Sequence, residues 1–202
     1  MRSDGGRLDH RIISRIVAPG TKVLDLGCGN GELMYLLVRE KNARVQGIEL
    51  DEAAIYECVR KGLSVIHGDI EEGLREYPDG SFDDVILNQS IQQVKKVDEV
   101  FEQALRIGRR IIVGFPNFAH LGARSMLFFL GRSPVTESLP YRWNDTPNVR
   151  FLSVTDFRRF CDERGLKILS AHYIGEGKEV RFRPNLFAKD ALFVISKNEG
   201  RK

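Results

Sequence analysis

The sequence predicts an α/β fold with a mostly parallel, seven-stranded sheet, and two observations carry this prediction. Apolar segments alternate with segments of helical periodicity from residue 8 to residue 117, which is typical of βαβ units and of a sheet covered on both faces. The last two apolar segments, 166–174 and 191–197, have no helix between them and are expected to pair as antiparallel neighbours. The length of 202 residues favours one domain, 1–202.

Each element of the first half is predicted from a local pattern. Apolar residues from Leu8 to Val17 fall on one helical face, and Pro19 and Gly20 end that helix, so 1–22 is expected to be an N-terminal helical segment. Asp51 suits the N-cap of a later helix. The expected strands are 21–27, 43–50, 63–69 and 82–90, and the expected helices are 31–40, 51–62 and a short turn at 71–77.

The second half starts regularly and then loses the alternation. A helix at 97–108 and a strand at 109–117 are expected, and a further helix at 155–165 with Thr155 as its N-cap. The intervening segment, 118–154, contains three prolines and shows no clean period. This segment after the fifth strand is therefore predicted to be a lid or a partner-binding segment.

The composition excludes several classes of protein. A net charge of +3 is too small to argue for nucleic-acid binding. The three cysteines are scattered, which fits reduced thiols in the cytoplasm better than disulfides or a metal site. The N-terminus has no apolar core typical of a secretory signal, and the longest apolar patch is too short for a membrane helix.

The segment "VLDLGCGNGE", residues 23–32, is the most informative stretch. An apolar strand meets Gly27, Gly29 and Gly31 and then a helix, and the glycines allow backbone torsions and close approaches that a Cβ would block. The spacing is G-x-G-x-G, whereas dinucleotide sites use G-x-G-x-x-G. The turn therefore predicts a ligand site at the carboxyl end of the first strand, but not a typical dinucleotide site.

Two carboxylates narrow the class of ligand. Asp25 lies two residues before the turn, where it would repel a pyrophosphate and suit a cationic group. Glu49 ends the second strand, where an acid can hold a pair of ribose hydroxyls. A ribose joined to a cation fits S-adenosylmethionine or S-adenosylhomocysteine.

Together these motifs resemble the class I S-adenosylmethionine-dependent methyltransferase fold, which is Rossmann-like. The resemblance implies that "DLGCGNG" holds the amino acid and ribose, that Asp69 after the third strand contacts the adenine, and that the end of "FDDVILNQS" lies beside the methionine. The cofactor-binding residues implied are Asp25, Gly27, Cys28, Gly29, Gly31, Glu49, Leu50, Asp69, Ile70 and Asn88.

Structural interpretations of the same residues remain open. Asp25 could be a structural cap, and Asp69 could only begin a turn. Cys28 is expected to be a small spacer rather than a nucleophile, because no histidine lies near it in the sequence. The segment "NQSIQQV" lacks the N-P-P-Y type motif that holds an amine, and His120 is expected to be structural, so no catalytic residue is assigned.

The segment 118–154 is rich in aromatic residues, methionine and arginine, a composition concentrated at protein interfaces. Phe128, Phe129 and Arg132 are the partner-binding candidates; a lid over the sheet or a substrate pocket are the alternatives. The stretches "FPNFAHLGARSMLFFLGRSPVT" and "LPYRWNDTPNVRFLSVTDFRRFC" resemble the MetW family of methionine biosynthesis proteins, and the resemblance extends from about residue 11 to 197. It implies a role beside a homoserine O-acyltransferase of the MetX type, in the first step of methionine synthesis.

Three functions are therefore considered. The first is a subunit that binds S-adenosylmethionine or S-adenosylhomocysteine and supports the acyltransferase. The second is an active small-molecule methyltransferase. The third, a nicotinamide-dependent oxidoreductase, is disfavoured by the glycine spacing and by Asp25.

Overall fold

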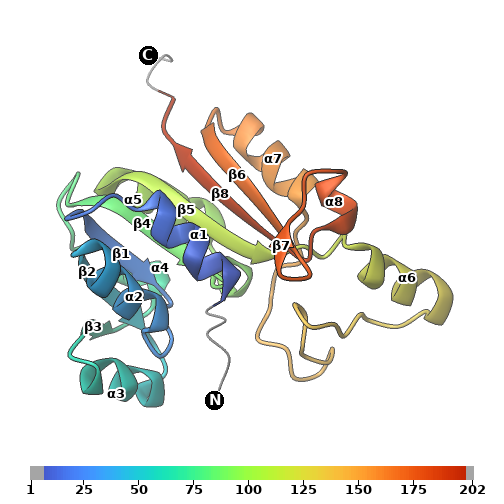
Figure 1. Cartoon of the computed structure of the whole chain (residues 1–202), viewed down its shortest axis with the longest axis horizontal. Coiled ribbons are helices and arrows are strands. Elements are labelled where there is room, and N and C mark those ends of the chain that lie inside the picture. The colour runs from blue at the N-terminus through green and yellow to red at the C-terminus, as the bar shows by residue number, and fades with distance from the viewer. Residues whose placement is uncertain (1–6, 199–202) are drawn as a thin grey trace.

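The structure, a computed structural model, describes residues 7–198 and contains one sheet of eight strands in the order β3-β2-β1-β4-β5-β8-β6-β7 (Figure 1). The strands are β1 (Lys22–Leu26), β2 (Arg44–Glu49), β3 (Ser64–His67), β4 (Phe82–Asn88), β5 (Gly108–Pro116), β6 (Lys167–Gly175), β7 (Lys178–Glu179) and β8 (Asp190–Ser196). The first five pair in parallel, and β8, β6 and β7 add antiparallel pairs at one edge.

Helices cover both faces of the sheet. They are α1 (Leu8–Ile16), α2 (Glu32–Lys41), α3 (Glu52–Arg60), α4 (Ile70–Gly73), α5 (Val97–Ile107), α6 (Leu121–Leu130), α7 (Val154–Glu163) and α8 (Pro184–Phe187), with a 3₁₀ turn η1 (Ile91–Gln93). Among the described residues, no helix combines the length and apolar character that crossing a bilayer requires.

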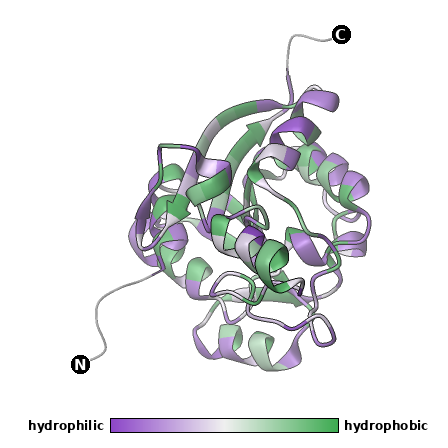
Figure 2. Ribbon diagram, turned by 90° about the vertical axis from the view of Figure 1, so that its right-hand side faces the viewer, coloured by the Kyte–Doolittle hydropathy of each residue, from purple (hydrophilic) through white to green (hydrophobic). Residues whose placement is uncertain are grey.

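Alternating strand residues build two separate hydrophobic cores. On β4, Val85 and Leu87 pack into a core with α5 and α7, whereas Ile86 packs into a second core with α1, α2 and α3. This alternation follows from the two-residue period of a strand. Figure 2 shows mainly hydrophobic residues in the strands, and helices that carry both hydrophobic and hydrophilic residues. The predicted α/β fold with a mostly parallel sheet is confirmed.

Four local expectations differ from the structure. A short helix, α8, lies between β6 and β8, where no helix was expected. The sheet has eight strands rather than seven, because the two-residue β7 extends β6 at the edge. The segment 118–154 contains a helix, α6, that the hydrophobic pattern did not predict. The N-cap of α7 is Ser153 and not Thr155: Ser153 and Asp156 form a reciprocal capping box, which satisfies two backbone N–H groups at once.

The strand order places a crevice at the carboxyl ends of β1 and β4. From β1 the chain winds outward to β2 and β3, and then returns to β4 on the other side of β1. The helices that follow β1 and β4 diverge from this point, which is where open α/β sheets bind ligands. The glycine turn after β1 and the residues at the end of β4, Asn88 and Gln89, are therefore brought together.

Candidate functional site

The glycine turn is held tightly against the sheet. Gly27, Gly29 and Gly31 have φ values of 74°, 53° and 76°, a region that side chains with a Cβ rarely adopt. A Cβ on Gly27 would lie 2.9 Å from the Cβ of Ser90, and one on Gly31 would lie 2.5 Å from Leu63 Cδ1. No atom lies within 4 Å of a Cβ built on Gly29, so at that position only the backbone conformation requires glycine.

Asp25 is a buried carboxylate at the end of β1, with 2% of the residue exposed. Burial, and then repulsion from Glu49, raises the pKa of Asp25 to about 7. No basic side chain among residues 7–198 forms an ion pair with it. A charge in this position is unfavourable until a cation neutralises it, which fits a ligand with an ammonium or sulfonium group.

Glu49, the last residue of the neighbouring strand β2, forms hydrogen bonds that stabilise the glycine turn. Its carboxylate accepts hydrogen bonds from the backbone N–H of Gly29 at 2.7 Å, of Leu50 at 2.8 Å and of Asp51 at 3.0 Å. The predicted ribose-binding acid is thus placed beside the glycine turn, and it also stabilises that turn directly. A ribose would have to share the carboxylate with these three donors.

A small cavity of about 180 Å³ lies at the turn. Half of the predicted cofactor-binding residues line it: Asp25, Gly27, Cys28, Gly29 and Asn88. The other five, Gly31, Glu49, Leu50, Asp69 and Ile70, do not line it. Ile70 still lies close, because its Cδ1 would be 3.4 Å from a Cβ on Gly27.

Sequence reasoning missed the contribution of α1 to this cavity. Arg7 and His10 line it from the first turn of that helix, together with Asn30, Glu32, Leu33 and Gln89. Asp9 anchors the arrangement, since it pairs with Arg7 at 2.7 Å and accepts a hydrogen bond from Asn88 Nδ2 at 2.9 Å. The sequence did contain an indication of this contribution: the first turn of α1 carries charged residues, whereas the rest of the helix packs its apolar face into the core.

Two predicted residues also have structural roles. The Cys28 thiol is buried, and burial raises its pKa well above the ordinary value, which suits a spacer and not a nucleophile. Asp69 caps the short helix α4 by accepting the Glu71 N–H at 2.8 Å. His120 likewise caps α6, accepting the Gly122 N–H at 3.1 Å.

Helix α6 projects away from the sheet at one end of the molecule (Figure 1). Phe128 is 82% exposed and Phe129 76% exposed, with ring centroids 4.9 Å apart in an edge-to-face pair. Arg132, two residues after the end of α6, is also exposed. These aromatic rings do not cover the sheet, because only Ala123 of α6 is buried.

Comparison with known proteins identifies relatives over nearly the whole chain. The family model described as "Methionine biosynthesis protein MetW" matches residues 7–195. The bifunctional methionine biosynthesis protein MetXA/MetW of Rhodopirellula baltica is 36% identical over 93% of this chain. The chain spans 32% of that relative's length.

Solved structures share the fold at low identity. A SAM-dependent methyltransferase from Archaeoglobus fulgidus matches with a TM-score of 0.71 and 17% identity, over 94% of this chain and 93% of the other. A TehB-like SAM-dependent methyltransferase from Corynebacterium glutamicum matches with a TM-score of 0.62 and 18% identity, over 94% and 87%. The chain therefore has the Rossmann-like class I methyltransferase fold.

Proposed function

Because the chain belongs to the MetW family of methionine biosynthesis proteins, we propose that it binds S-adenosylmethionine or S-adenosylhomocysteine and supports a homoserine O-acyltransferase of the MetX type. In this proposal it acts in the cytoplasm, in the first step of methionine synthesis. One observation carries the ligand part: Asp25 is a buried carboxylate, without an ion-pair partner among the described residues, on the wall of a cavity at a glycine turn.

The ligand would lie across the ends of β1, β2 and β4. Its ammonium would neutralise Asp25, its ribose hydroxyls would bind Glu49, and its adenine would lie near Leu50, Asp69 and Ile70. Leu50 is 56% exposed, which leaves an apolar side chain free to cover an adenine face. S-adenosylmethionine supplies an activated methyl group when bound; this chain's own residues would bind, orient and partly enclose it.

The partner part of the proposal has independent support. In the Rhodopirellula baltica relative, one polypeptide carries the names MetXA and MetW, and this chain corresponds to 32% of it. Joining the two in one chain holds them at high effective concentration, and we propose that separate chains achieve the same proximity by binding each other. The exposed Phe128–Phe129 pair and Arg132 form the surface that would bind the acyltransferase.

An active methyltransferase is the second candidate, and the fold shared with SAM-dependent methyltransferases favours it. A labelled-methyl transfer assay on cell extract separates the two functions. Transfer of label to a small molecule, with no effect on acyltransferase activity, would favour the methyltransferase.

The proposal is tested by reconstitution. Purified chain is mixed with a homoserine O-acyltransferase, and homoserine acylation is measured with and without S-adenosylhomocysteine. We expect co-purification and a higher acylation rate in the mixture than with the acyltransferase alone. Separate proteins that neither co-purify nor change the rate would contradict the partner proposal, and calorimetry that detects no S-adenosylhomocysteine binding would contradict the ligand proposal.

A further inference from the structure

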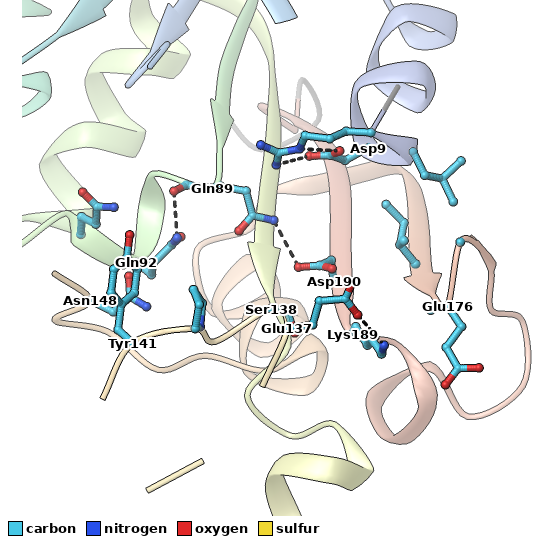
Figure 3. A pocket seen from close by; sticks show the side chains of 17 residues that line it. Asp9, Gln89, Gln92, Glu137, Ser138, Tyr141, Asn148, Glu176, Lys189 and Asp190 are labelled. Atoms are coloured by element: carbon cyan, nitrogen blue, oxygen red, sulfur yellow. Dashed lines mark hydrogen bonds and ion pairs between the residues drawn. The ribbon is translucent and has the colours of Figure 1, made fainter. Parts of the chain in front are cut away.

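A second, larger cavity of about 860 Å³ adjoins the small cavity at the glycine turn (Figure 3). Arg7 and Gln89 line both cavities. The larger cavity is built from the start of α1, the turn after β4, the segment around residues 137–148, the end of β6 and the start of β8. The function proposed above uses none of its other wall residues.

The charge of this cavity is unbalanced. Its wall carries four carboxylates, Asp9, Glu137, Glu176 and Asp190, against two cations, Arg7 and Lys189. Both cations are already engaged, since Arg7 pairs with Asp9 at 2.7 Å and Lys189 with Glu137 at 2.8 Å. Glu176 and Asp190 have no ion-pair partner among residues 7–198.

The cavity wall also contains a buried side-chain amide, that of Gln92, whose oxygen lacks a hydrogen-bond donor among residues 7–198. Gln92 lies in the cavity wall with 5% of the residue exposed, and its Nε2 donates to the Gln89 carbonyl at 2.8 Å. That bond fixes the orientation of the amide, because a flipped amide would point an oxygen at a carbonyl. Its Oε1 consequently has no hydrogen-bond partner in the described part of the chain, although buried acceptors are normally satisfied.

Gln89 forms hydrogen bonds with two other residues of this wall, and it does so in an unfavourable backbone conformation. Its φ of 62° is unusual for a residue other than glycine. In this conformation its side-chain Nε2 donates to Asp190 Oδ1 at 3.2 Å while its carbonyl receives the Gln92 bond. Figure 3 shows Gln89 between Gln92 and Asp190. Burial raises the pKa of Asp190 to about 6, as expected for a carboxylate that still lacks a cation.

We propose that the large cavity is a second ligand site, for a small polar molecule that carries one or more ammonium groups. An ammonium offers only donors, and it would pair with the uncompensated carboxylates Asp190 and Glu176; Gln92 Oε1, buried in the same wall, adds acceptor character but would need a side-chain rotation to reach the ligand. An anionic ligand would meet net repulsion there. The site shares Arg7 and Gln89 with the small cavity, but its carboxylates Asp190 and Glu176 belong neither to that cavity nor to the acyltransferase surface, so it can stand if either of those proposals fails.

Calorimetry on the full chain tests this site with three probes of similar length. The probes are putrescine, which has two ammonium groups, 1,4-butanediol, which is neutral, and succinate, which is a dianion. We expect putrescine to bind, and butanediol and succinate to bind at least about tenfold more weakly. Butanediol or succinate binding as tightly as putrescine would overturn the proposal, as would no binding of putrescine.

Variants locate the bound probe. Asp190→Asn should weaken putrescine binding at least about tenfold, and Glu176→Gln on the exposed rim should weaken it by a smaller factor. Glu102→Gln is the matched control, because it removes an exposed carboxylate that does not line the cavity. Glu176 neither lines the small cavity nor forms a hydrogen bond or ion pair, among residues 7–198, with a residue that does, so S-adenosylhomocysteine affinity should be unchanged in Glu176→Gln. Wild-type putrescine affinity in both Asp190→Asn and Glu176→Gln would contradict the site. Because Glu176 is exposed, Glu176→Gln is expected to fold normally.

Discussion

The glycine turn after β1 and helix α6 both depart from the usual pattern of buried apolar and exposed charged side chains, in opposite ways. At the turn, the carboxylate of Asp25 is buried without an ion-pair partner in the described chain; on α6, the aromatic rings of Phe128 and Phe129 are exposed without cover. Buried charge and exposed large apolar surface are both unfavourable for an isolated protein. Under the proposed function, each region would be completed by a different molecule, a cationic ligand at the turn and the acyltransferase on α6.

Asp25→Asn should have the largest effect at the turn. It leaves the ligand's ammonium in a buried site without a counter-charge, so S-adenosylhomocysteine affinity should fall by at least about 3 kcal/mol, or more than about 100-fold. Calorimetry measures the loss, and binding of acyltransferase is the control that should not change. Affinity within a few-fold of wild type would show that Asp25 is a structural cap.

The pH dependence of unfolding probes the same carboxylate without ligand. Folding raises the pKa of Asp25 from 3.8 to about 7, so between these pH values the folded state binds more protons than the unfolded state. This group's contribution to the free energy of unfolding therefore falls as pH rises from about 4 to 7, by a few kcal/mol. Urea unfolding across this interval should show a smaller fall in Asp25→Asn; identical profiles would contradict the assignment.

On α6, Phe129→Ala should lower acyltransferase affinity by at least about 2 kcal/mol, as at an interface hot spot. The melting temperature and S-adenosylhomocysteine affinity should be unchanged, because Phe129 is 76% exposed and lies outside the small cavity. Pull-down and homoserine acylation measure the effect. A folded variant that still binds and activates the acyltransferase normally would remove Phe129 as an anchor.

Glu49→Ala should weaken S-adenosylhomocysteine binding by about 1–3 kcal/mol, the range for hydrogen bonds to a charged group. Because the carboxylate also accepts three backbone N–H bonds, the variant should melt at a lower temperature than wild type. Calorimetry and a melting curve separate the two effects. Lower stability with unchanged affinity would assign Glu49 to the turn alone.

Gly29→Ala should have the smallest effect on folding, about 1 kcal/mol, because its φ is positive but nothing lies within 4 Å of a new Cβ. Gly80→Ala is a matched control, since Gly80 also has a positive φ and open space but lies outside the small cavity. We expect similar losses of stability in urea unfolding, with S-adenosylhomocysteine binding weakened only in Gly29→Ala. Equal affinities in the two variants would place the ligand away from Gly29.

The sequence by itself determined the α/β fold and the place of the glycine turn. The periods of strands and helices are local properties of the sequence, so they can be interpreted without knowing the tertiary contacts. Glycine likewise marks the turn, because the backbone has a positive φ at Gly27, Gly29 and Gly31. The antiparallel pairing of β6 with β8 also followed, because the sequence shows no long crossover helix between them; the connection holds only the four-residue helix α8. Helix α6 was missed because a helix that buries only Ala123 has no apolar stripe to reveal it.

Only the tertiary structure decided what surrounds the turn. Arg7 and His10 reach the small cavity from α1, while Asp190 meets Gln89 across 101 positions of sequence. Such contacts depend on strand order and helix packing, which local periodicity does not encode. The raised pKa of Asp25 also required the folded chain, because burial is a property of the packed molecule and not of the residue.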